Sequence, residues 1–192
     1  MSVKSILIVG VGGQGTLLAS KLMGSALVST GRDVKVSEVH GMSQRGGSVI
    51  TYVRYGDKVD SPIINEGQAD VILSFELLEA ARYLPYLKKG GVIITNTQKI
   101  DPMPVITGAA VYPEEIENKI KEKGAKIIAV DALSMAENVG SAKAVNVVLL
   151  GVASSYMDIS EEDWLTTIRE GVPAKFTDLN LAAFKAGRSV NQ

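Results

Sequence analysis

The residues Gly10-Val11-Gly12-Gly13-Gln14-Gly15 decide the fold, because they follow an apolar run at 6–9 and precede a helical pattern from residue 16 to about residue 29. Glycine permits a positive φ and has no Cβ to hold the backbone away from a ligand, and free N–H groups at a helix start attract anions. The sequence therefore predicts a nucleotide-type α/β fold whose first loop faces a phosphorylated ligand. Such turns also serve only to pack a helix on a strand, and the Gln14 amide could equally hydrogen-bond a neighbouring loop.

Composition favours one α/β domain with a sheet covered on both faces. The 192 residues are 46% hydrophobic but only 5% aromatic, so Val, Ile, Leu and Ala must fill the core. A net charge of −1 disfavours nucleic-acid binding, because no basic excess exists to neutralise phosphates. No apolar run approaches the roughly twenty residues of a membrane span, and no signal peptide is recognised, so we expect a cytoplasmic protein without membrane contact.

The absence of cysteine limits the chemistry that this chain can perform. Iron–sulfur clusters need thiolate ligands, and structural zinc sites usually need them too. The single histidine, His40, excludes most zinc and non-haem iron sites, and a Cys–His nucleophile pair is impossible. A lone histidine is more often a satisfied loop or core residue than a catalyst, and we assign no catalytic residue to the chain.

The pattern along the chain predicts a mostly parallel sheet with one antiparallel insertion. Residues 33–39 alternate like a second strand, a polar loop covers 40–47, and 48–55 resume strand character with no helix between them. Further strands are expected at 71–74, 92–96 and 125–130, a loop at 98–108, and helices at 76–87, 113–123, 132–137, 142–156, 160–170 and 177–187. The helix at 142–156 is so apolar that it suits a central helix or a partner interface.

Three features together resemble a known family. The glycine turn, the loop His40-Gly41-Met42-Ser43-Gln44-Arg45-Gly46-Gly47 and the helix carrying Asn146 and Gly151 are similar to the gamma-type domain of 2-oxoacid:ferredoxin oxidoreductases, in their indolepyruvate (arylpyruvate) branch. The resemblance extends to the closing segment 180–187 and implies one gamma-type domain over residues 1–192, with a Rossmann-like three-layer architecture.

The resemblance implies a subunit of an enzyme that oxidatively decarboxylates a 2-oxoacid to an acyl-CoA and passes electrons to ferredoxin. Thiamine diphosphate, Mg²⁺ and the iron–sulfur clusters would belong to a larger partner subunit, since this chain has neither cysteine nor a Gly-Asp-Gly thiamine motif. The chain would be inactive alone, and its residues would help to position coenzyme A. The residues that the resemblance places near CoA are Gly10, Gly12, Gly13, Gln14, Gly15, Thr16, Arg45, Gly46 and Gly47.

Two other functions fit parts of the sequence. Glu38 lies at the distance from the glycine turn at which NAD-dependent dehydrogenases place a ribose-binding acid, although no catalytic Tyr-x-x-x-Lys pair accompanies it. A non-catalytic nucleotide-binding module would also combine a glycine turn with the apolar helix at 142–156. Arg45 likewise has two interpretations, an anion contact or a pair with an acid at a subunit interface.

Overall fold

The sheet of the computed structural model is mixed and six-stranded, and the structure describes residues 2–40 and 47–191. The strands are β1 (Lys4–Val11), β2 (Asp33–His40), β3 (Ser48–Gly56), β4 (Ala69–Ser74), β5 (Leu87–Asn96) and β6 (Lys126–Val130). Their spatial order is β2-β3-β1-β4-β5-β6. Strand β3 runs antiparallel to both neighbours, whereas β1, β4, β5 and β6 pair in parallel. The expected antiparallel insertion is therefore confirmed as β3.

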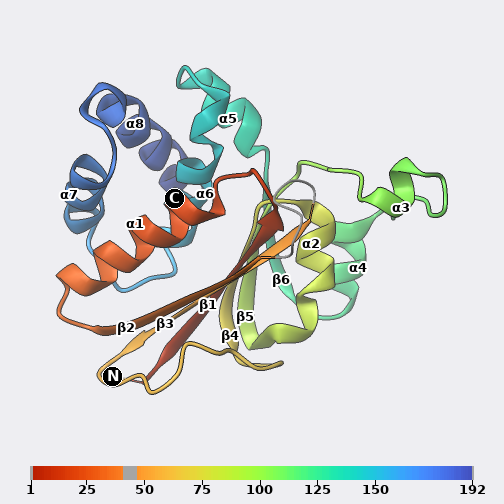
Figure 1. Ribbon diagram of the computed structural model, residues 1–192, viewed down its shortest axis with the longest axis horizontal. Helices are drawn as coiled ribbons and strands as arrows, with labels where there is room; N and C mark the ends of the chain where they lie inside the picture. The colour runs from red at the N-terminus through yellow and green to blue at the C-terminus, as the bar shows by residue number, and fades with distance from the viewer. Residues whose placement is uncertain (1, 41–46, 192) are drawn as a thin grey trace.

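Helices cover both faces of the sheet, which gives the three layers expected from the composition (Figure 1). On one face lie α1 (Thr16–Ser29), α5 (Ala132–Asn138), α6 (Val145–Ser154), α7 (Glu161–Gly171) and α8 (Thr177–Arg188). The other face carries α2 (Leu77–Arg82) and α4 (Ile116–Glu122). The alternation of β1 separates the two cores, because Ile6 and Ile8 belong to the first while Leu7 and Val9 belong to the second.

Helix α6 is a central helix, which is one of the two interpretations of its apolar sequence. Every residue from 146 to 154 is buried, and α6 packs closely against α8. Glycines make this close crossing possible: a Cβ on Gly151 would lie 2.2 Å from the Phe184 carbonyl oxygen, and one on Gly187 would lie 1.9 Å from the Val148 carbonyl oxygen. Both glycines are therefore required by packing between two helices.

Several element boundaries differ from the sequence prediction, and prolines explain two of them. The helix expected at 76–87 ends at Arg82, because Pro85 cannot continue it and a 3₁₀ turn, Leu84–Tyr86, follows. The charged helix expected at 113–123 is confined to α4 (Ile116–Glu122), after Pro113. Strand β5 begins at Leu87, where the helix expected at 76–87 was to end, and Gly90 and Gly91 lie inside this strand.

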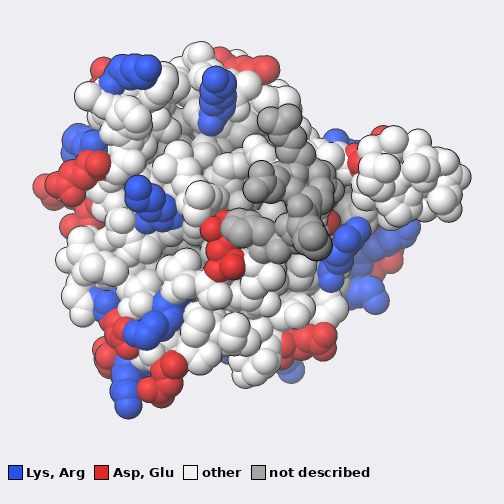
Figure 2. All heavy atoms as spheres, in the orientation of Figure 1, with Lys and Arg blue, Asp and Glu red and all other residues white. Residues whose placement is uncertain are grey.

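Two further corrections concern short segments. The loop expected at 98–108 contains a helical turn, α3 (Met103–Ile106), which starts after Pro102. Helix α8 spans Thr177–Arg188 where a helix was expected at 177–187, and Phe176, not Thr177, lies at the cap position. Among the described helices, none is long and apolar enough to cross a membrane. On the face in Figure 2, acidic and basic residues are interspersed, as the near-neutral charge suggests.

Candidate functional site

The glycine turn lies where β1 meets α1, at the edge of the sheet formed by the carboxyl ends of the parallel strands (Figure 1). Ligands of open α/β sheets bind at this edge. The pairing of β1 with β3 continues to Val11 and Ser48, and the Gly12 amide donates to the Gly47 carbonyl oxygen at 2.9 Å. The glycine turn and the end of the predicted 40–47 loop are thus in contact. Arg45 and Gly46 lie outside the described residues.

Two glycines of the turn are explained by packing. A Cβ on Gly10 would lie 2.9 Å from Gln14 Oε1 and 3.0 Å from Phe75 Cβ, and Thr16 Cγ2 is 3.2 Å away. Gly15 has φ 83°, and a Cβ there would lie 2.8 Å from Asn146 Nδ2 at the start of α6. The Asn146 side chain donates to the Gly15 carbonyl oxygen at 3.4 Å. Asn146, which carried part of the family resemblance, therefore joins α6 to the glycine turn.

Gln14 binds the protein itself, in agreement with the interpretation that its amide hydrogen-bonds a neighbouring loop. Its Oε1 accepts from the Val11 amide at 2.8 Å, and its Nε2 donates to the Phe75 carbonyl oxygen at 2.9 Å. The same Nε2 lies 3.3 Å from Gln98 Oε1. The carboxamide thus ties the turn to the segment after β4 and to the segment after β5, and its two N–H groups are used.

Gly13 differs from the other described glycines of the turn. It is exposed, has φ 100°, and a Cβ there would meet no atom within 4 Å. The backbone N–H groups of Gly13, Gly15 and Thr16 have no hydrogen-bond partner within residues 2–40 and 47–191. These three N–H donors lie beside the start of α1 and carry partial positive charge, so they suit an anionic group.

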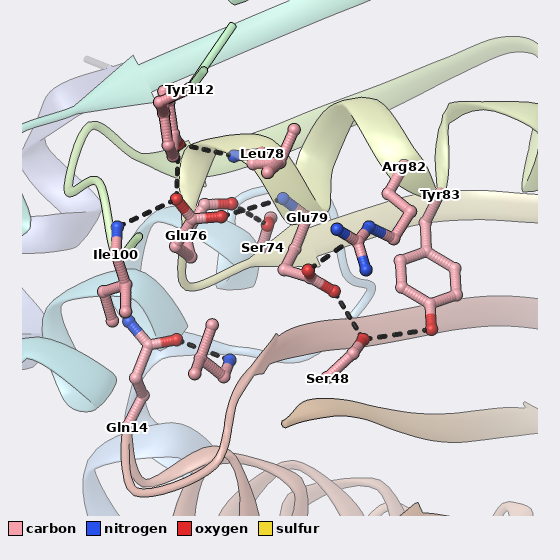
Figure 3. A network of polar contacts seen from close by, with 11 residues as sticks. Gln14, Ser48, Ser74, Glu76, Leu78, Glu79, Arg82, Tyr83, Ile100 and Tyr112 are labelled. Carbon is pink, nitrogen blue, oxygen red and sulfur yellow. Dashed lines mark hydrogen bonds and ion pairs between the residues drawn. The ribbon is translucent and has the colours of Figure 1, made fainter. Parts of the chain in front are cut away.

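A network of buried carboxylates that the sequence analysis did not identify lies beside the turn (Figure 3). Glu76 is 1% exposed and precedes α2. Its Oε2 accepts from the Glu79 amide at 2.9 Å, and its Oε1 accepts from the Ile100 amide at 3.1 Å and from the Tyr112 hydroxyl at 2.5 Å. Burial raises the pKa of Tyr112 most, and the hydrogen bond of Tyr112 to Glu76 and the charge of Glu76 raise it further. Burial of a carboxylate costs free energy unless its oxygens accept hydrogen bonds, and both oxygens of Glu76 do so.

The second carboxylate, Glu79, is 4% exposed and binds the first residue of β3. Its Oε2 accepts from the Ser48 hydroxyl at 2.5 Å, and its Oε1 lies 3.5 Å from Arg82 Nε. Burial raises the pKa of Glu79, the proximity of Glu76 adds to the rise, and the bond from Ser48 and the charge of Arg82 oppose it. This edge of the molecule therefore contains a carboxyl group that holds a proton more readily than an exposed glutamate.

The two carboxylates share a small polar cavity of about 40 Å³. Its lining comes from the ends of β1 and β3, from α2 and from the segment after β5: Val11, Ser48, Glu76, Leu78, Glu79, Arg82, Ile100 and Pro102. The available sequence signal was a pair of glutamates three residues apart just after a buried strand, at the same sheet edge as the glycine turn. Within the described residues, no group of three His, Cys, Asp or Glu side chains could hold a metal ion.

The sheet order weighs against the NAD-dependent dehydrogenase. Because β3 lies between β2 and β1, Glu38 pairs with Thr51 and Thr51 pairs with Ile8. Glu38 is therefore two strands from β1, about 9–10 Å by the usual strand spacing. A ribose-binding acid would have to lie on the strand next to β1.

Comparison with known proteins agrees with this geometry. The family described as Pyruvate ferredoxin/flavodoxin oxidoreductase matches residues 5–190. The chain is 48% identical to indolepyruvate oxidoreductase subunit IorB of Thermococcus kodakarensis, over 95% of this chain and 93% of that protein. Its fold is similar to the crystal structure of a keto/oxoacid ferredoxin oxidoreductase gamma subunit from Geobacter sulfurreducens, with TM-score 0.72, 25% identity, and 97% and 96% of the two chains covered.

A longer enzyme contains the same fold. The 2-oxoglutarate:ferredoxin oxidoreductase of Magnetococcus marinus, solved with 2-oxoglutarate, coenzyme A and succinyl-CoA bound, matches with TM-score 0.75 and 20% identity. The match covers 99% of this chain but 31% of that one. The family match over nearly the whole sequence, the identity to IorB and the shared fold lead to one conclusion: this chain belongs to the pyruvate ferredoxin/flavodoxin oxidoreductase family.

Proposed function

We propose that this chain is a subunit of a hetero-oligomeric 2-oxoacid:ferredoxin oxidoreductase that acts on indolepyruvate or another aryl pyruvate. The observation that carries the proposal is the 48% identity to an indolepyruvate oxidoreductase subunit over 95% of the chain. In the reaction the bond to the carboxylate breaks and releases CO₂, and the CoA sulfur forms a thioester with the remaining acyl carbon. The thiol proton is released, and two electrons pass singly to two ferredoxins.

The reactive groups of this enzyme would be held by a larger subunit. The sequence has no cysteine for cluster ligands, and the described part of the chain offers no three-residue carboxylate or histidine group for a metal. Bound in that subunit, thiamine diphosphate with its Mg²⁺ supplies the decarboxylation chemistry, and the iron–sulfur clusters carry the electrons to ferredoxin. This chain then contributes by binding CoA and by closing the site.

The CoA contact that we propose lies at the glycine turn. The open backbone at Gly13 and the amides of Gly13, Gly15 and Thr16, which find no acceptor among the described residues, suit a phosphate, which needs N–H donors and close approach. Gly10, Gly12 and Gln14 would act by shaping the turn. In this proposal Arg45 adds a charged anion contact, and Gly46 and Gly47 let the loop pass close to the ligand.

A pair of matched glycine variants tests this role. Gly13 and Gly31 both have positive φ, and a Cβ at either would meet no atom within 4 Å. Alanine at each position should therefore cost a similar ~1–2 kcal/mol of backbone strain, but only Gly13→Ala adds a methyl group at the proposed CoA contact. In the assembled enzyme we expect Gly13→Ala to raise the KM for CoA about tenfold, as expected for one lost hydrogen bond, with Gly31→Ala near wild type. Equal KM values for the two variants would contradict the CoA contact.

Charge at the loop provides a second test. Arg45→Ala should raise the KM for CoA by roughly 10- to 100-fold, the range for a lost charge-assisted hydrogen bond, and should change the KM for the oxoacid much less. Arg169→Ala, on the exposed side of α7, serves as the control for loss of an arginine. A larger effect on the oxoacid than on CoA would refute this placement. Equilibrium binding of NAD but not CoA by the isolated chain would instead support the dehydrogenase.

A further inference from the structure

Residues 101–111, here named the arm, project from the body of the molecule beyond α4 (Figure 1). The arm is internally ordered, because the Ile106 amide donates to the Pro102 carbonyl oxygen at 3.1 Å and the Thr107 amide to the Met103 carbonyl oxygen at 2.9 Å. Yet its large apolar side chains face solvent: Met103 is 63% exposed, Ile106 65% and Val111 87%. An ordered segment that presents apolar side chains is typical of a protein–protein contact.

Apart from its first residue, Asp101, the arm also lacks charge. No Asp, Glu, Lys or Arg occurs between Asp101 and Glu114, and Figure 2 shows the projecting lobe in white. Exposed loops are usually rich in polar turn residues, and a single exposed apolar residue is normal. In the arm, three exposed apolar side chains lie within nine positions. We therefore expect the surface that covers the arm to be apolar and uncharged. Charged side chains on that surface would lose their hydration and find no opposite charge on the arm beyond Asp101.

The buried carboxylate of Glu76 holds both ends of the arm. Its Oε1 accepts from the Ile100 amide, just before the arm, and from the Tyr112 hydroxyl, just after it (Figure 3). The Tyr112 oxygen also accepts from the Leu78 amide at 3.1 Å. A segment that is fixed at both ends loses little conformational entropy when it binds, so the arm can bind a partner without a change of conformation.

The base of the arm is connected to the glycine turn. Gln98 Oε1 lies 3.3 Å from Gln14 Nε2, and the Gln98 carbonyl oxygen accepts from the Leu77 amide at 3.1 Å. A polypeptide that covers the arm would therefore lie at the same sheet edge as the proposed CoA contact. Because the arm adjoins the proposed CoA contact, the protein that covers the arm is expected to be the subunit that completes the reaction site.

We propose that the arm docks into an uncharged apolar groove of the larger, thiamine diphosphate-carrying subunit, an inference that rests on the proposed function. One observation favours that subunit over a second copy of this chain: the base of the arm adjoins the proposed CoA contact, through the contact between Gln98 and Gln14.

The test uses separately purified larger subunit, titrated with labelled full-length chain. The arm variant carries Met103→Ser, Ile106→Ser and Val111→Ser. The control variant carries Leu17→Ser, Val28→Ser and Val36→Ser, at apolar positions that are 60%, 61% and 46% exposed on α1 and β2. Because all six side chains are exposed, both variants should unfold at wild-type denaturant concentrations. We expect the arm variant to bind the larger subunit about 100-fold more weakly, and the control within about threefold of wild type.

The outcomes separate the two proposals. Wild-type binding by the arm variant, or equal losses in arm and control variants, would overturn docking through the arm while leaving the proposed function intact. Self-association of the wild-type chain that the arm substitutions abolish, with binding to the larger subunit unchanged, would overturn it in favour of a second copy. Failure of the wild-type chain to bind the larger subunit at all would refute the proposed function and this inference with it.

Discussion

Replacing Glu76 by alanine should destabilise the protein strongly and release the base of the arm. The carboxylate is 1% exposed and is the acceptor for the Glu79 amide, the Ile100 amide and the Tyr112 hydroxyl. Each buried donor left without an acceptor costs ~1–3 kcal/mol, and water that enters the vacated space relieves part of that cost. The sum is a loss of about 3–5 kcal/mol, a large fraction of the ~5–15 kcal/mol that stabilises a typical protein.

Glu76→Gln provides the matched control. Glutamine keeps the size and one acceptor oxygen but turns an N–H group toward at least one of the donors, so we expect a loss of only ~1–2 kcal/mol. Urea unfolding followed by circular dichroism measures both values, and hydrogen exchange should show faster exchange at the Ile100 amide in Glu76→Ala. A loss below ~1 kcal/mol for Glu76→Ala, with Ile100 still protected, would refute the role assigned to this carboxylate.

Two other predictions concern packing and pH. Gly187→Ala places a Cβ 1.9 Å from the Val148 carbonyl oxygen, so it should lower the free energy of unfolding in urea by ~3 kcal/mol or more. Gly24→Ala is the control, because its Cβ would make only an ordinary 3.6 Å contact, and it should be neutral or stabilising. Similar values for the two variants would contradict the tight α6–α8 crossing. Because the folded-state pKa of Glu79 is raised, the folded protein takes up a proton before the unfolded chain does as pH falls toward the unperturbed pKa of 4.5. The stability of wild type relative to Glu79→Gln should therefore increase as pH falls through that range, and a difference independent of pH would contradict the raised pKa.

Local patterns were enough to predict the elements that depend on neighbouring residues. The glycine spacing after an apolar run predicted the turn and α1, and two successive strand patterns predicted the antiparallel β3. Pro85 ended a helix that the hydrophobic periodicity would have continued, because periodicity does not detect a missing N–H group. The place of β3 between β2 and β1 depends on pairing across the sheet, which no local pattern contains.

The candidate site was predicted only in part for the same reason. The turn was identified, but the use of Gln14 became clear only from its contacts with Phe75 and Gln98, 61 and 84 residues away. The Glu76 network was missed because its partners Ile100 and Tyr112 lie 24 and 36 residues further along the chain. A glutamate just before a short surface helix is normally solvated, and burial alone distinguishes Glu76 from such a residue.

We propose that this chain completes a site whose reactive groups belong to another subunit. CoA-dependent reduction of ferredoxin by indolepyruvate tests this proposal when it is measured with the purified chain alone, with the larger subunit alone and with the two combined. We predict turnover only in the combined sample, with an apparent KM for CoA that rises in Gly13→Ala and not in Gly31→Ala. Full turnover by the purified chain alone would contradict the claim.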